Sequence, residues 1–126
     1  MEKKQAMKWV KALLSGKYKQ TDGKLKKVYK NGNVKGHCCL GVLAEISKCD
    51  QESILAEDLL DNVSMQRQCG INTHDGEARG EEGGIIYFAA KIDGKEKEFS
   101  SLADANDEGA SFEQIAEYIK KNYQNL

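Results

Sequence analysis

Two histidines and four cysteines are the side chains of this sequence best suited to metal binding or nucleophilic chemistry. They are His37, Cys38, Cys39, Cys49, Cys69 and His74. No Cys-x-x-Cys or His-x-x-x-His pair occurs, so their spacing matches no common structural zinc pattern. Nothing in the sequence marks an activated thiol. We therefore interpret Cys38 and Cys39 as small apolar core residues and expect no metal and no other cofactor. A metal- or thiol-dependent enzyme is kept as a second alternative.

Carboxylates form two further groups, one around Asn106 and one between residues 77 and 82. Paired carboxylates can perform acid–base chemistry or bind a hard cation. Turn and capping chemistry before a final helix explains Asp107 more simply. A buried asparagine usually satisfies backbone groups, and we also keep Asn106 as a candidate ligand contact. The glycines between residues 80 and 84 match no phosphate-binding pattern.

Charge is distributed very unevenly along the chain. Residues 1–36 carry eleven lysines and two acidic residues, a net charge of +9, whereas the other ninety residues carry −10. This asymmetry can steer an anionic ligand or nucleic acid to one face. It can equally attract the two halves to each other, within one chain or in a head-to-tail homo-oligomer, or reflect genome composition. The basic residues of the segment 1–36 are all lysine, which lacks the planar guanidinium with which arginine binds phosphate in a bidentate manner.

Lysines interleaved with aromatic residues can bind a nucleotide or a single strand through charge and stacking. Trp9 lies on an apolar stripe, so we expect it in the core. The ligand contacts that we expect come from the basic front, from an irregular segment over residues 62–84, and from the Asn106 turn. They are Lys17, Tyr18, Lys19, Lys24, Tyr29, Arg67, His74, Arg79 and Asn106.

The elements that must position these residues follow from apolar periodicity and turn signals. Helical spacing predicts helices over residues 3–15, 38–48 and 51–61, and a last helix opened by a Ser-Phe-Glu-Gln capping box at Ser111. Asn-Gly-Asn and Asp-Gly turns predict hairpins over residues 24–36 and 85–99. Gly41 lies inside the second helix, where it predicts close approach of another backbone. Residues 100–106 read as a short helix or turn.

The predicted architecture is α+β, with a small antiparallel sheet of two hairpins and three to four helices packed on one face. At 126 residues we expect a single domain, 1–126, with a long irregular loop at about 62–84. Such a loop is usually functional or mobile. No apolar run approaches the roughly 20 residues of a membrane span. The first residues lack a secretory apolar core, so we expect a cytoplasmic protein without membrane contact.

Three motifs occur in a fixed order. They are Trp-x-x-Ala-Leu-x-Ser-Gly-Lys-Tyr-x-Gln over residues 9–20, Cys-Cys-Leu-Gly-Val-Leu over 38–43, and Leu-x-x-x-Asn-Asp-x-Gly-x-Ser-Phe-x-x-Ile-Ala-x-x-Ile over 102–119. Together they resemble a family of small uncharacterised phage and prophage proteins. Ala44 stands where that family has a third cysteine, and Ala105 where it usually has leucine. The resemblance implies a phage origin and action in a bacterial host cytoplasm, and it implies no reaction.

A short phage protein without a catalytic signature is most simply a non-enzymatic binding protein. We expect a counter-defence or host-takeover factor that sequesters an anionic host nucleotide signal or blocks a host defence protein. A nucleic-acid-binding regulatory protein is the alternative.

Overall fold

The α+β class predicted from the sequence is confirmed by a computed structural model that describes residues 1–126. The helices are α1 (Lys3–Leu14), α2 (Cys39–Ile46), α3 (Gln51–Ala56), α4 (Val63–Cys69), α5 (Leu102–Asp107), α6 (Phe112–Asn122) and the 3₁₀ turn η1 (Tyr123–Asn125). The strands are β1 (Lys26–Val28), β2 (Val34–His37), β3 (Phe88–Ile92) and β4 (Lys95–Phe99). The six α-helices outnumber the three or four expected, because α4 and the short α5 also form.

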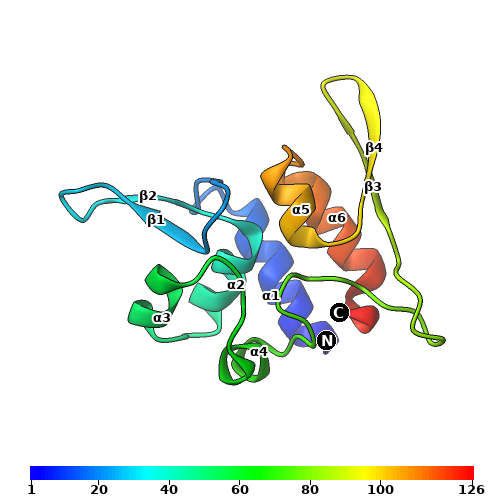
Figure 1. Ribbon diagram of the computed structural model, residues 1–126, viewed down its shortest axis with the longest axis horizontal. Coiled ribbons are helices and arrows are strands. Elements are labelled where there is room, and N and C mark those ends of the chain that lie inside the picture. The colour runs from blue at the N-terminus through cyan, green and yellow to red at the C-terminus, as the bar shows by residue number, and fades with distance from the viewer.

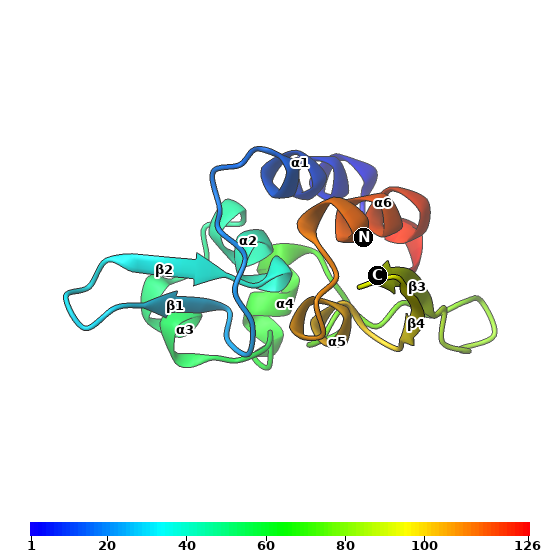
Figure 2. The ribbon, with the colours of Figure 1, turned by 90° about the horizontal axis from the view of Figure 1, so that it is seen from above.

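Helices α1 and α6 lie side by side, and α2 packs against α1 (Figures 1 and 2). The helical spacing of apolar residues explains this contact, since each helix buries one stripe. The buried residues are Ala6, Trp9, Val10 and Leu13 on α1, and Phe112, Ile115, Ala116 and Ile119 on α6. The capping box predicted at Ser111 is present, with Gln114 as its partner. None of the helices is long and apolar enough to cross a membrane.

Helix α2 occupies the centre of the core. Six of its residues, Cys39 to Ala44, are buried, and Cys38 is its N-cap, with Sγ accepting a hydrogen bond from the Gly41 N–H. The predicted close approach at Gly41 is confirmed, because a Cβ there would lie 1.7 Å from the Leu25 carbonyl oxygen. The loop between α1 and β1 therefore passes directly over α2.

The two hairpins form separate two-stranded antiparallel sheets at opposite ends of the molecule (Figures 1 and 2). In the first, Val28 pairs with Val34 and Lys27 with Gly36, so a bulge leaves Lys35 unpaired. In the second, Phe88 to Ile92 pair in regular register with Phe99 to Lys95. Each hairpin is anchored to the helical core at one end only, and its turn projects into solvent.

The segment at about 62–84 is not irregular throughout, because its first third forms α4. Asn62 caps this helix by accepting hydrogen bonds from the Ser64 and Met65 N–H groups, and Gly70 ends it at φ +74°. Only Met65 and Cys69 of α4 are buried, which is too few apolar positions to reveal a helical stripe in the sequence. From Gly70 to Tyr87 the chain is irregular, apart from a bridge between Arg79 and Ile85.

Candidate functional site

The loop between α1 and β1 lies along β2 like a short extra strand. His37 N–H donates to the Lys19 carbonyl at 2.8 Å, and Thr21 N–H donates to the His37 carbonyl at the same distance. Gly36 permits this approach, since a Cβ there would lie 2.6 Å from the Lys19 carbonyl oxygen. The backbone of residues 19–21 is therefore fixed against the hairpin.

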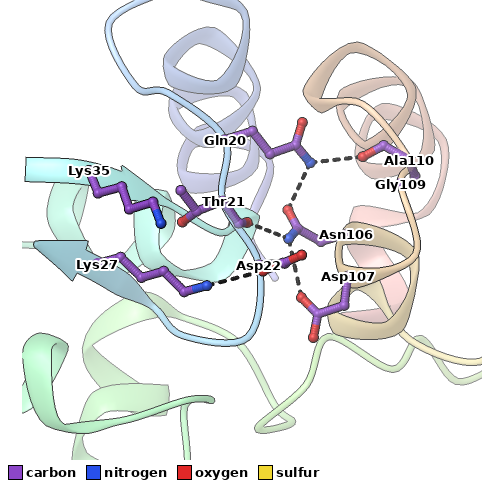
Figure 3. Close-up of a pocket in the computed structure, with 9 residues that line it drawn as sticks. All are labelled: Gln20, Thr21, Asp22, Lys27, Lys35, Asn106, Asp107, Gly109 and Ala110. Atoms are coloured by element: carbon purple, nitrogen blue, oxygen red, sulfur yellow. Dashed lines mark hydrogen bonds and ion pairs between the residues drawn. The ribbon is translucent and has the colours of Figure 1, made fainter.

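Asn106, near the end of α5, connects this loop to α2, and its bonds to Gln20 and Thr21 of the loop are drawn in Figure 3. Its Oδ1 accepts hydrogen bonds from Cys39 N–H at 3.1 Å and from Gln20 Nε2 at 2.9 Å. Its Nδ2 donates to the Thr21 carbonyl at 2.8 Å and contacts an oxygen of Asp107 at 3.4 Å. Because protein atoms occupy both its donor and its acceptor positions, Asn106 holds the loop in place and offers no free group to a ligand.

A polar hollow of about 330 Å³ opens beside this amide. It is lined by Gln20, Thr21, Asp22, Lys27, Lys35, Asn106, Asp107, Gly109 and Ala110 (Figure 3). Its charges are balanced: Lys27 Nζ lies 3.1 Å from Asp22 Oδ1, and Asp107 accepts a hydrogen bond from the Gly23 N–H. The Thr21 hydroxyl is buried without a hydrogen-bond partner. The polar hollow also brings together the end of the first sequence motif, at Gln20, and the early part of the third, at Asn106 to Ala110.

A second hollow, of about 540 Å³, shares Lys27 and Lys35 with the first. We call it the lysine hollow, and it is lined by Lys24, Lys26, Lys27, Val28, Lys35 and Leu55. No carboxylate lines it. Lys24 and Lys35 form no ion pair, so their ammonium groups are available to an anion.

Lys26 is already committed to a half-buried cluster beneath the hairpin. Its Nζ lies 3.2 Å from Glu45 Oε2, and His37 Nε2 lies 2.7 Å from the same oxygen. Burial raises the pKa of Glu45, but hydrogen bonds from Gln51, His37 and Lys26 outweigh it and hold that pKa below its ordinary value. Glu45 is therefore a carboxylate, and Lys26 serves the fold rather than a ligand.

The thiols are held in protonated, structural positions. Burial raises the pKa of Cys38 to about 11 and that of Cys39 well above its ordinary value. The Cys39 thiol faces the Leu102 carbonyl at 3.7 Å, and Cys49 and Cys69 face each other at 3.7 Å. A buried thiol with a raised pKa is a poor nucleophile, which agrees with the packing role inferred from the sequence.

Three of the candidate ligand residues line hollows, but not the same one. Lys24 lines the lysine hollow, whereas Lys17 and Tyr18 line a separate hollow of about 340 Å³ between α1 and α2. The Tyr18 ring packs edge-on against His37, with centroids 5.2 Å apart. Lys19 is exposed and contributes its carbonyl to the pairing with β2.

The other candidates are dispersed over the molecule. Tyr29 lies at the tip of the first hairpin, and Arg67 lines a hollow beside the start of α1. The Nε2 atom of His74 lies 4.0 Å from Oδ2 of the neighbouring Asp75. Arg79 pairs with Glu77 and also donates to the Gly83 carbonyl.

Sequence reasoning missed the residues that complete the two adjoining hollows. Among them are Gln20, Asp22, Lys27, Lys35 and Leu55. The sequence could have predicted that Lys27 and Lys35 lie close together, because they flank the Asn-Gly-Asn turn and a hairpin brings such residues side by side. Nothing in the sequence placed Leu55 against β1.

One family model, described as "Domain of unknown function (DUF8296)", matches residues 1–123 of the chain. No curated protein and no solved structure matches it.

Proposed function

We propose that this chain, which belongs to the DUF8296 family, is a phage-encoded protein that acts by binding an anionic ligand of its host. The observation that carries the proposal is the lysine hollow, which four lysines line and no carboxylate does. Its volume of about 540 Å³ falls within the usual range of small-molecule sites. An anion entering it would meet two ammonium groups that have no partner in the protein.

The chemistry of the lysine hollow fits a nucleotide. Lys24 and Lys35 supply charge for phosphate, while Val28 and Leu55 add an apolar wall against which a flat base can lie. Lysine binds phosphate as a point charge and does not require one fixed geometry. This tolerance suits recognition of the phosphate together with contact to the base, whether the nucleotide is linear or cyclic.

The backbone that presents Lys24 is well fixed. The neighbouring Leu25 is fully buried, donates its N–H to the Glu57 carbonyl at 3.2 Å, and accepts from Cys38 N–H at 3.3 Å. On the other side of Lys24, the Gly23 N–H donates to Asp107. A site with a fixed backbone loses less conformational entropy when a ligand binds.

The biological role follows from the resemblance of the three motifs to small phage and prophage proteins. A phage protein that binds a nucleotide in the bacterial cytoplasm can sequester a host signal, which makes it a counter-defence or host-takeover factor. The alternative within the same proposal is that the lysine surface blocks a host defence protein. The protonated, buried thiols give no support to the enzymatic alternative.

The test is isothermal titration calorimetry of the protein against a panel of linear and cyclic nucleotides. Each of Lys24→Gln and Lys35→Gln should weaken binding about fivefold, since an exposed ion pair contributes up to about 1 kcal/mol. Leu55→Ser should weaken the binding of nucleotides, which have a base to lie against Leu55, but not the binding of inorganic pyrophosphate, which has none. The matched control is the double variant Lys95→Gln/Lys97→Gln, which removes two charges from the other hairpin.

Absence of heat with every nucleotide would exclude signal sequestration. An equal loss in the Lys95/Lys97 control would show that net charge, and not the lysine hollow, determines binding.

A further inference from the structure

The first hairpin extends beyond the lysine hollow as a projecting arm (Figures 1 and 2). We call residues 28–34 the tip. Its turn is closed by three hydrogen bonds: Tyr29 N–H to the Asn33 carbonyl, Gly32 N–H to the Tyr29 carbonyl, and Asn33 N–H to Asn31 Oδ1. Gly32 adopts φ +88°, as a tight turn requires. The tip is therefore an ordered structure, and Val28 is its one residue that lines the lysine hollow.

The side chains of the tip are unusual for a solvent-exposed turn. Tyr29 is 52% exposed, and the cross-strand pair Val28 and Val34 is also exposed. Lys30 lies next to Tyr29 and forms no ion pair. From residue 24 to residue 36 the chain carries five lysines and no acidic residue. An aromatic ring, an aliphatic pair and a lysine without an ion pair thus all project from one short turn.

We propose that the tip and the adjoining Lys35 bind single-stranded nucleic acid, with bases against Tyr29 and the valine pair and phosphates against Lys30 and Lys35. This goes beyond nucleotide binding in the lysine hollow, because Tyr29, Lys30 and Val34 lie outside that hollow and the ligand is a polymer; Val28 and Lys35 would contact both ligands. Stacking on an exposed aromatic ring is open to every base, and flexible lysines follow a phosphate backbone without reading sequence. The surface therefore fits a single strand of any sequence.

Single strands are favoured over two other partners. A two-stranded ribbon can enter the major groove of a duplex, but a duplex keeps its bases stacked and offers no ring face to Tyr29. An acidic protein could pair with the lysines, but it would not require an aromatic ring at the tip.

The strength of the salt dependence can be worked out from the lysines. About three phosphate contacts are expected, from Lys30, Lys35 and Lys27. Lys27 is counted because its only ion-pair partner, Asp22, is largely exposed. Three contacts give a slope of log K against log salt of about −2 for single strands. Affinity should then fall about 20-fold between about 50 and about 200 mM salt.

The experiment is fluorescence anisotropy of the full chain with fluorescein-labelled oligothymidylate, and with the same oligonucleotide paired to oligoadenylate. Tyr29→Ala should weaken single-strand binding about tenfold, because stacking contributes roughly 1–3 kcal/mol per base. Lys30→Gln should make the salt slope shallower by about 0.7. Matched controls are Tyr87→Ala, at a residue that is 56% exposed just before β3, and Lys97→Gln on β4. Both controls should bind like the unmodified protein.

Three outcomes would overturn the proposal: no anisotropy change at low salt, equal affinity for single strand and duplex, or equal losses in tip and control variants. Nucleotide calorimetry of Tyr29→Ala separates the two proposals. Tyr29 does not line the lysine hollow, so nucleotide binding should be unchanged whether or not the oligonucleotide binds.

Discussion

Replacing Asn106 by alanine should lower the free energy of unfolding by about 2–4 kcal/mol. The substitution removes the acceptor of the Cys39 N–H and the donor to the Thr21 carbonyl. A buried polar group left without a partner costs roughly 1–3 kcal/mol. Cys39 is fully buried, so its N–H should incur the larger cost, whereas water from the polar hollow can reach Thr21. Gln20 loses less, because its amide still donates to the Ala110 carbonyl at 2.8 Å.

Urea unfolding followed by the fluorescence of Trp9 is the direct assay. Trp9 is the only tryptophan, it is fully buried, and its ring N–H donates to the Cys39 carbonyl at 2.9 Å. With a urea dependence of about 1–3 kcal/mol per molar for a small protein, the midpoint should fall by about 0.7–4 M. The matched control is Asn122→Ala, since the Asn122 side chain bonds only the Tyr118 carbonyl of its own helix. It should change stability by less than about 0.5 kcal/mol.

A double-mutant cycle between Gln20→Ala and Asn106→Ala tests whether the two amides act together. They share one hydrogen bond of 2.9 Å, so their effects should be non-additive by at least about 0.5 kcal/mol. If Asn106→Ala costs no more than the Asn122 control, or if the cycle is additive, Asn106 does not hold the loop and our account of this site fails.

The remaining predictions concern glycine and cysteine positions. Gly41→Ala should lower the free energy of unfolding by at least about 3 kcal/mol, since its Cβ would lie 1.7 Å from the Leu25 carbonyl oxygen. The control Gly84→Ala, whose Cβ would meet no atom within 4 Å, should leave stability nearly unchanged. Equal urea midpoints for the two variants would contradict the contact at Gly41. Cys38→Ser should be more stable in thermal melts than Cys38→Ala by about 1 kcal/mol, because a hydroxyl can replace the thiol as N-cap acceptor. Burial raises the pKa of Cys69 from 9.0 to about 12. Above about pH 9 the unfolded chain therefore loses a proton that the native chain keeps, so the free energy of unfolding should fall as the pH rises. Cys69→Ser should flatten this fall in urea midpoints measured between about pH 8 and about pH 11, and an unchanged slope would contradict it.

Local patterns in the sequence were reliable where short-range physics decides the outcome. The stripe on α1, the capping box at Ser111 and the Asn-Gly-Asn turn each depend on residues within a few positions, and all three are confirmed. Gly41 shows that a costly residue can also predict a tertiary contact, although the sequence could not say that Leu25 would supply it.

Contacts between segments far apart in the chain could not be predicted from the sequence. The pairing of the loop at Gln20 with His37 joins segments that carry no complementary pattern, so the alignment of the lysines with Leu55 could not be foreseen. The expected ligand residues were selected by type, and the structure separates them. Helix α4 was missed because its exposed face is large and Val63 points to solvent.

The hydrogen bonds of Asn106 also bear on how the protein acquires its binding surface. They join residues 67 and 85 positions apart in the chain, and contacts of such separation form slowly because a long loop must close first. During synthesis the lysines leave the ribosome early, long before Asn106 is translated. A nascent or truncated chain therefore carries the positive charge of the N-terminal segment but lacks the α5 asparagine that fixes the loop beside the lysine hollow. We expect selective ligand binding to appear only when translation has passed α5.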